Sequence, residues 1–197
     1  GRPFKTRSGD TIKLAELLNE AKQRAYKLVT EKNPTLENVE RQKIAERIGI
    51  GAVKYADLSK NRTSDYVFDW ETMLSFEGNT APYLLYAYAR IRSILRKAPE
   101  KKVDEIQNLS TPEERALCLK VLQLAEVIEA VDRDCMPNQL CNYLFELSGL
   151  FMKFYENCPI LKAEKRQMNT RLALCSLTAE TLQQGFELLG ITPLEQM

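Results

Sequence analysis

The 197-residue chain is nearly neutral, with 28 lysines and arginines against 27 aspartates and glutamates, and 44% of its residues are hydrophobic. This composition is typical of a folded domain rather than a disordered segment, and the length allows one domain or two small ones. The sequence lacks any apolar run near the roughly 18 residues of a membrane span, and its first residues lack the apolar stretch of a signal peptide. We therefore expect a cytoplasmic protein that does not interact with a membrane.

The sequence has five cysteines and no histidine, which argues against several kinds of protein, and its charge is unevenly distributed. An odd cysteine count without a Cys-x-x-Cys pair argues against a disulfide framework and a zinc site, so we expect reduced thiols and no metal. Without histidine, imidazole-based triads and general bases are excluded. Residues 1–102 carry 20 basic and 13 acidic side chains, whereas residues 103–197 carry 8 and 14. Any long-range attraction for nucleic acid is therefore expected from the first half.

Helices and one short strand are predicted in the first 77 residues. Leucines and alanines at helical spacing predict a helix from about residue 13 to residue 32. A second helix is predicted over residues 36–48, ending at Gly49, and a short third one over residues 52–58. Residues 66–68 are predicted to form a strand that is too short for a sheet of its own, so it needs a partner from elsewhere.

Residues 80–97 form the most informative predicted helix. Thr80 can cap its N-terminus, with Pro82 in the first turn, where a missing N–H costs nothing. At 3.6 residues per turn, one stripe is apolar and suits a core, while another carries aromatic and basic side chains that can contact a polyanion. The second stripe can equally be half-buried tyrosines beside a solvated basic face. The stripes are Leu84, Tyr88, Ile91 and Leu95, and Tyr83, Tyr86, Arg90 and Lys97.

A capping box opens the next predicted helix, after a charged loop over residues 99–108. Thr111 can accept from the backbone of the first turn, and Glu114 can reach back to the capping residue. The apolar side of this helix is expected to form one continuous buried stripe: Leu117, Val121, Leu124, Ile128 and Val131.

Two more helices complete the predicted second half. One begins at Pro137 and ends before Pro159, and the other runs from about residue 169 to residue 189, with Gly190 as its left-handed terminator. Four amphipathic helices with connections of several residues predict an antiparallel bundle over residues 78–197. The inward faces are expected to be Leu140, Leu144, Leu147, Phe151 and Phe154, and Leu172, Cys175, Leu182, Phe186 and Leu189.

The run from residue 78 to residue 92, Gly-Asn-Thr-Ala-Pro-Tyr-Leu-Leu-Tyr-Ala-Tyr-Ala-Arg-Ile-Arg, closely resembles a known family. It is similar to the segment that opens the all-helical anticodon-binding domain of arginyl-tRNA synthetases, especially the bacterial-type enzymes. Residues 49–58, residues 65–70 and the tail over residues 189–193 ending in Met197 are similar to the same family. The resemblance covers essentially the whole chain.

The resemblance implies an all-α fold, in which residues 78–197 are an antiparallel helical bundle that binds the anticodon. Residues 1–77 are then the end of the catalytic domain with its helical connection, mostly helical with one short strand. The implied function is the C-terminal portion of a synthetase that binds the anticodon loop of arginine tRNA. The intact enzymes of this family activate arginine with ATP and transfer it to the tRNA, so ATP, magnesium and arginine are implied for the intact enzyme only. A monomer is the default expectation.

The basic N-terminal string over residues 3–9 is either an exposed terminus or a loop that places cations against phosphate. In the family it resembles a degenerate form of the class I Lys-Met-Ser-Lys-Ser loop, although these residues do not reproduce that motif. The resemblance implies that Lys5, Thr6 and Arg7 stabilise the phosphates of ATP. A chain without histidine cannot contain the histidine-bearing nucleotide-pocket signature of class I, so we expect the isolated chain to be inactive in aminoacylation.

The resemblance also implies anticodon contacts from the helix over residues 80–97, from the turn after the penultimate helix and from the last residue. Stacking on unpaired bases suits the tyrosines and the arginine of that helix. Arg171, at the beginning of the last helix, is a further candidate, or else a surface ion-pair partner. The other implied contacts are Tyr83, Tyr86, Arg90, Asn157, Leu161 and Met197.

Two other functions stay open from the residues alone. One is a non-catalytic helical module that binds a protein partner through the aromatic helix. The other is an RNA-binding module without synthetase activity. Salt separates RNA from protein binding, because only the former weakens steeply as salt rises.

Overall fold

The computed structural model describes residues 13–99 and 106–197, and every regular element in these ranges is a helix. This confirms the all-α prediction. None of the described helices is both long and apolar enough to cross a membrane. The helices are α1 (Leu14–Lys32), α2 (Asn38–Leu58), α3 (Trp70–Met73), α4 (Ala81–Lys97), α5 (Pro112–Leu122), α6 (Leu124–Asp134), α7 (Asn138–Asn157) and α8 (Lys165–Leu188).

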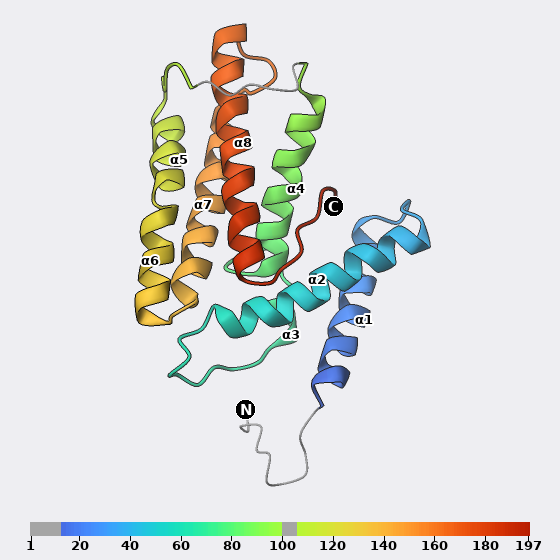
Figure 1. Cartoon of the computed structure of the whole chain (residues 1–197). Coiled ribbons are helices and arrows are strands. Elements are labelled where there is room, and N and C mark those ends of the chain that lie inside the picture. The colour runs from blue at the N-terminus through green and yellow to red at the C-terminus, as the bar shows by residue number, and fades with distance from the viewer. Residues whose placement is uncertain (1–12, 100–105) are drawn as a thin grey trace.

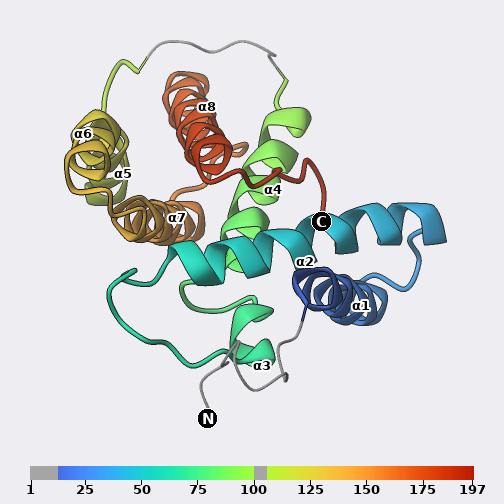
Figure 2. The same ribbon diagram turned by 60° about the horizontal axis from the view of Figure 1, so that its bottom comes forward.

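The helices α4 to α8 form an upright bundle, and α2 crosses its lower end (Figure 1). Seen from below, α2 runs beneath α7 and α4, with α1 packed along its outer side (Figure 2). One continuous core extends from Ala25 of α1 to Leu194 beyond α8. Tyr55 of α2 enters this core at 1% exposure, and its hydroxyl lies 2.8 Å from the carbonyl oxygen of Cys141 in α7. The first three helices and the bundle therefore share one interior.

The helix α4 begins and packs as its sequence predicts. The Thr80 side chain accepts a hydrogen bond from the backbone N–H of Tyr83, and proline occupies the first turn. Leu84, Tyr88 and Ile91 of the apolar stripe are all at most 1% exposed. Burial of an aliphatic side chain stabilises the fold by about 1.5–3 kcal/mol, so this stripe fixes which face of α4 turns inward.

The predicted inward faces of α7 and α8 are likewise buried, and both helices end as expected. Gly190 has φ +65°, and the N–H of Ile191 donates to the carbonyl oxygen of Phe186 at 2.8 Å. Glycine adopts this left-handed conformation without a Cβ penalty. The terminator turns the chain back toward α4, which determines the path of the last seven residues.

The prediction of one continuous helix after the capping box, with a buried stripe along its whole length, is wrong for the second half of that helix. The chain breaks at Gln123 into α5 and α6, and no residue of α6 is buried. Because α6 packs mainly against α7 and the end of α5, its apolar side meets too few neighbours to be enclosed. Ile128, expected in the core, is 37% exposed.

The predicted helix end at Gly49 is also wrong, because α2 continues through Gly49 and Gly51 to Leu58. A Cβ at Gly49 would lie 2.7 Å from the carbonyl carbon of Ala21 in α1. The glycine therefore serves the close crossing of α1 and α2 rather than a helix end.

The predicted strand over residues 66–68 is absent from the described residues, where this segment is irregular. A strand needs a paired neighbour for its backbone groups, and the described chain offers none here. The segment is held by side chains instead: the Tyr66 hydroxyl lies 3.4 Å from Oδ1 of Asp57, and the ring of Phe68 packs edge-on against Trp70.

The crossing of α1 and α2 yields a matched pair of substitutions. Gly49→Ala should lower the free energy of unfolding by about 1–3 kcal/mol, because backbone atoms of α1 cannot rotate away from the added methyl group. Gly51→Ala should be neutral or stabilise by up to about 1 kcal/mol, because its Cβ would meet only side chains at 3.5 Å or beyond and alanine favours helix. Chemical denaturation followed by circular dichroism measures both. Equal effects of the two substitutions would contradict the close crossing.

Candidate nucleic-acid interface

A groove of about 630 Å³ opens between the C-terminal half of α4, the end of α7, the turn after α7 and the last two residues. Every charged side chain that the described residues contribute to its lining is basic: Arg90, Arg96, Lys97 and Lys162. Four cations around one groove favour a polyanionic ligand, because neutralising phosphates releases their counterions.

Arg90 lies at the centre of this lining, between two aromatic rings. The central carbon of its guanidinium is 4.7 Å from the ring centroid of Tyr86 and 4.8 Å from that of Tyr155. The Tyr86 hydroxyl also accepts a hydrogen bond from the guanidinium. A cation over an aromatic face contributes about 0.5–1 kcal/mol at a partly exposed site. The two rings therefore restrain Arg90 and leave further N–H groups for a ligand.

The turn after α7 forms one wall of the groove and is anchored from below. The backbone N–H of Cys158 donates the last helical hydrogen bond, to the carbonyl oxygen of Phe154 at 2.9 Å, and α7 ends because Cys158 itself has an extended backbone conformation. Ile160 is only 6% exposed and inserts into the core, while Leu161 remains 38% exposed at the groove. Burial of Ile160 therefore fixes the backbone of the turn, and the neighbouring Leu161 side chain is directed outward to the groove.

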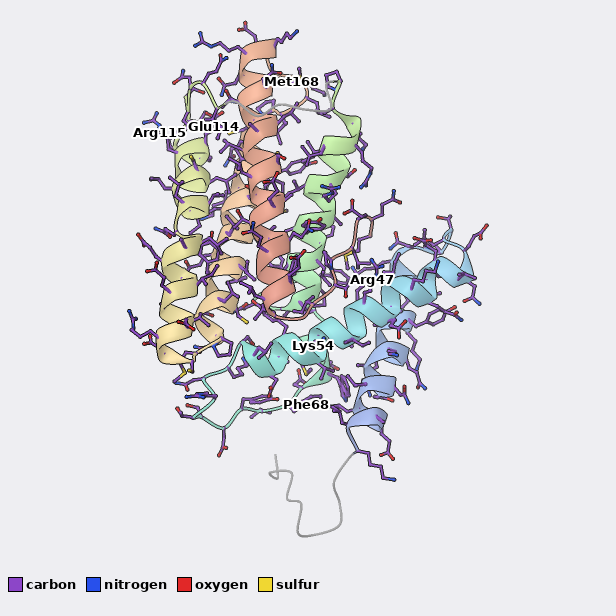
Figure 3. The ribbon with its side chains drawn as sticks, in the orientation of Figure 1. Arg47, Lys54, Phe68, Glu114, Arg115 and Met168 are labelled. Atoms are coloured by element: carbon purple, nitrogen blue, oxygen red, sulfur yellow. The ribbon has the colours of Figure 1, made fainter. Side chains whose placement is uncertain are left out.

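A buried ion pair supports this wall. Nε of Arg171 in α8 donates to Oε1 of Glu114 at 2.7 Å, and Nη1 of Arg171 donates to the carbonyl oxygen of Pro159 in the turn at 2.6 Å. Glu114 is fully buried and Arg171 is 8% exposed. Figure 3 shows Glu114 near the upper end of α5, where the predicted capping box has formed.

Several donors compensate the burial of Glu114. Desolvation alone raises the pKa of this carboxyl, but hydrogen bonds from Arg171 and from the backbone N–H groups of Thr111 and Ser110 lower it more. Gln167 donates to the same carboxylate at 2.6 Å. The pKa of Glu114 therefore lies below its ordinary value, and the carboxylate stays ionised as the partner of Arg171.

The groove brings together several residues that the sequence separates widely. Tyr86, Arg90, Leu161 and Met197 all line it. Sequence reasoning missed Tyr155, which is 39% exposed one position after the buried Phe154. Its signal was an aromatic residue just off the apolar stripe of α7, at the end of the helix nearest the predicted contact turn. Lys162 was missed as well, and it follows that turn directly.

Other predicted site residues lie elsewhere. The Tyr83 ring packs against Phe145 of α7, with centroids 5.7 Å apart, and Tyr83 does not line the groove. Asn157 is exposed on the last turn of α7 without lining the groove. Arg171, considered as a surface residue from sequence, is buried. Lys5, Thr6 and Arg7 lie outside the described residues.

Comparisons with known proteins identify the type of domain that carries the groove. A family model described as the DALR anticodon binding domain matches residues 84–197, and one described as the catalytic domain of class I tRNA synthetases (R) matches residues 1–70. The chain therefore belongs to the arginyl-tRNA synthetase family, with a DALR anticodon-binding domain as its larger part.

The chain is similar to arginine–tRNA ligases both in sequence and in structure. The chain is 58% identical over 199 residues to the arginine–tRNA ligase of Colwellia psychrerythraea and 53% identical over 197 residues to that of Chromobacterium violaceum. All of the chain is covered in both cases, but only 34% of each relative. The arginyl-tRNA synthetase of Thermus thermophilus superimposes with a TM-score of 0.88 at 34% identity, over 96% of this chain and 33% of that one. The Plasmodium falciparum enzyme gives 0.85 at 34% identity, over 94% and 34%.

The buried ion pair provides a test of how the turn is supported. Arg171→Ala should lower the free energy of unfolding by about 3–5 kcal/mol, because it leaves the Glu114 carboxylate buried beside fewer donors. Arg115→Ala, which truncates the exposed next residue of α5, should change it by less than about 1 kcal/mol. Thermal and urea unfolding of the two variants measure the difference. A similar small effect for both would show that the pair is dispensable for stability.

Proposed function

We propose that the chain is the tRNA-reading portion of an arginine–tRNA ligase and that its groove binds the anticodon loop of arginine tRNA. The observation that carries the proposal is the Arg90 guanidinium held between Tyr86 and Tyr155, in a groove whose charged side chains are all basic among the described residues. Family membership and the similar arginine–tRNA ligases support it.

The chemistry of the groove fits an RNA loop better than a duplex. Sequence-specific RNA recognition works mainly on unpaired bases, which stack on aromatic or guanidinium planes and expose their hydrogen-bonding edges. Tyr155 and the apolar side chains of Leu161 and Met197 offer surfaces for bases, while Arg96 and Lys97 offer charge for phosphates. Each base stacked on an aromatic ring contributes roughly 1–3 kcal/mol by alanine substitution.

The remaining predicted residues take different roles in this proposal. Tyr83 supports the contact between α4 and α7 rather than the RNA, since its ring is packed on Phe145. Arg171 acts through the carbonyl oxygen of Pro159 and so positions the turn. Asn157 meets the loop from the rim of the groove, where it is exposed.

The wider activity is proposed for the intact enzyme, since the chain spans about a third of the curated relatives it matches. There, arginine is activated with ATP and magnesium and transferred to tRNA, with residues 1–77 at the end of the catalytic domain and residues 78–197 as the anticodon-binding part. Lys5, Thr6 and Arg7 are proposed to contact the phosphates of ATP. We further propose a cytoplasmic monomer.

The anticodon proposal is tested by filter binding of the chain to arginine tRNA, a non-cognate tRNA and an arginine tRNA with an altered anticodon. We expect the first to bind most tightly and its affinity to fall steeply with salt. Arg90→Ala should weaken arginine tRNA binding by roughly 1–3 kcal/mol without loss of helicity. Arg133→Ala, an exposed arginine on α6, is the charge-matched control and should change binding much less.

Two results would contradict this function. Equal affinities for the three tRNAs would leave a non-specific RNA-binding module. Binding of a protein partner that persists at high salt, without preference among tRNAs, would favour the protein-interaction alternative.

A further inference from the structure

The last eight residues form a tail that is attached to the rest of the chain at several successive residues. After Gly190 the tail runs upward beside α4 (Figure 1). Ile191 and Leu194 are each 3% exposed and anchor it in the core. Two cations of α2 hold its backbone: Nζ of Lys54 donates to the carbonyl oxygen of Gly190 at 2.5 Å, and Nη1 of Arg47 donates to that of Pro193 at 3.0 Å. Both cations lie along α2 near the tail (Figure 3).

Glu195 makes the final attachment, and all of its partners lie on one face of α4. Its Oε2 accepts from Nε of Arg92 at 2.8 Å, and its backbone carbonyl oxygen accepts from Nη1 of Arg96 at 2.8 Å. The Tyr88 hydroxyl lies 3.3 Å from its Oε1. The partners are spaced four residues apart, which places them one above another on the helix. The hydrogen bond to Glu195 raises the pKa of Arg92.

The position of Glu195 in the chain matters for the groove. The two residues that follow it, Gln196 and Met197, both line the groove, which also contains Arg96. Arg96 therefore belongs to the groove and to the attachment of the tail at once. Wherever Glu195 is held, the next two residues can reach only a small part of the surface, because a residue spans at most about 3.6 Å.

We propose that Glu195 is a positioning residue for tRNA binding, which fixes Gln196 and Met197 in the wall of the groove through Arg92, Arg96 and Tyr88. The inference rests on the proposed function of the groove and adds how its tail wall is built. A carboxylate near an RNA site otherwise repels phosphate and occupies arginines that phosphate can bind. Positioning and repulsion therefore predict opposite signs when Glu195 loses its charge.

The sign of the change in affinity is measured by binding of arginine tRNA to the Glu195→Gln and Glu195→Ala variants of the full chain. Positioning predicts that both weaken binding, by roughly threefold to tenfold given the partial exposure of the two ion pairs. Glu126→Gln removes the same charge from the exposed surface of α6 and should leave affinity unchanged or slightly higher. Tighter or equal binding of both Glu195 variants overturns the inference. Circular dichroism melts check that the variants stay folded.

A double-mutant cycle shows whether Glu195 acts through the groove residues that follow it. Truncating both positioned side chains, Gln196→Ala with Met197→Ala, should itself weaken binding, and Glu195→Ala should then add little in that background, because the positioned side chains are already missing. Additive losses would mean that Glu195 acts independently of Gln196 and Met197, which also overturns the inference. A wild-type chain that does not prefer arginine tRNA overturns the proposed function itself, a result distinct from wild-type binding with unaffected Glu195 variants.

Discussion

The buried contact of Glu114 with Arg171 is the interaction on which the groove most depends, because one ion pair holds α5, α8 and the turn after α7 together. Glu114 belongs to the N-terminal turn of α5, Arg171 to α8, and Pro159 to the turn after α7. Breaking a buried pair costs more than the pair contributes over an apolar replacement, since the remaining charge is left without a partner. The contact is therefore better understood as fixing the geometry of the turn than as a source of net stability.

The helix α4 connects the groove with the rest of the molecule, because each of its sides contacts a different part of the structure. Leu84 and Ile91 face the core, Arg90 faces the groove, and Arg92 faces the tail. A helix can serve all three because its side chains project around a full turn every 3.6 residues. A rotation of α4 that moved Arg90 would also move the core and the tail contacts, so the packed stripe indirectly holds the guanidinium in place.

Periodicity and capping made the helices of the bundle predictable, whereas contacts between distant segments did not. The buried faces of α7 and α8, the Thr80 cap and the Gly190 terminator follow from local spacing and local backbone chemistry. The role of Gly49 depended on α1, which packs against it from 28 residues earlier in the chain. The break at Gln123 could not be predicted, because no proline or glycine lies near it in the sequence.

Some residues of the candidate site were predictable from the sequence, but Tyr155, Lys162 and the assembly of the groove were not. The aromatic and basic stripe of α4 pointed to Tyr86 and Arg90, and the family resemblance added Leu161 and Met197, all of which meet at one groove. The burial of Arg171 depends on a carboxylate 57 residues away, which no local pattern reveals.

The distribution of charge over the folded surface explains how a nearly neutral chain can attract RNA to one place. The excess of acidic residues in the second half includes Glu126, Glu129 and Asp132, all exposed on α6. Both views place α6 across the bundle from α4 (Figures 1 and 2). The basic groove and the acidic helix therefore face different directions, and the field of the molecule favours approach of a polyanion from the α4 side. The fold thus separates the four cations of the groove, which come from both halves of the sequence, from the exposed carboxylates of α6.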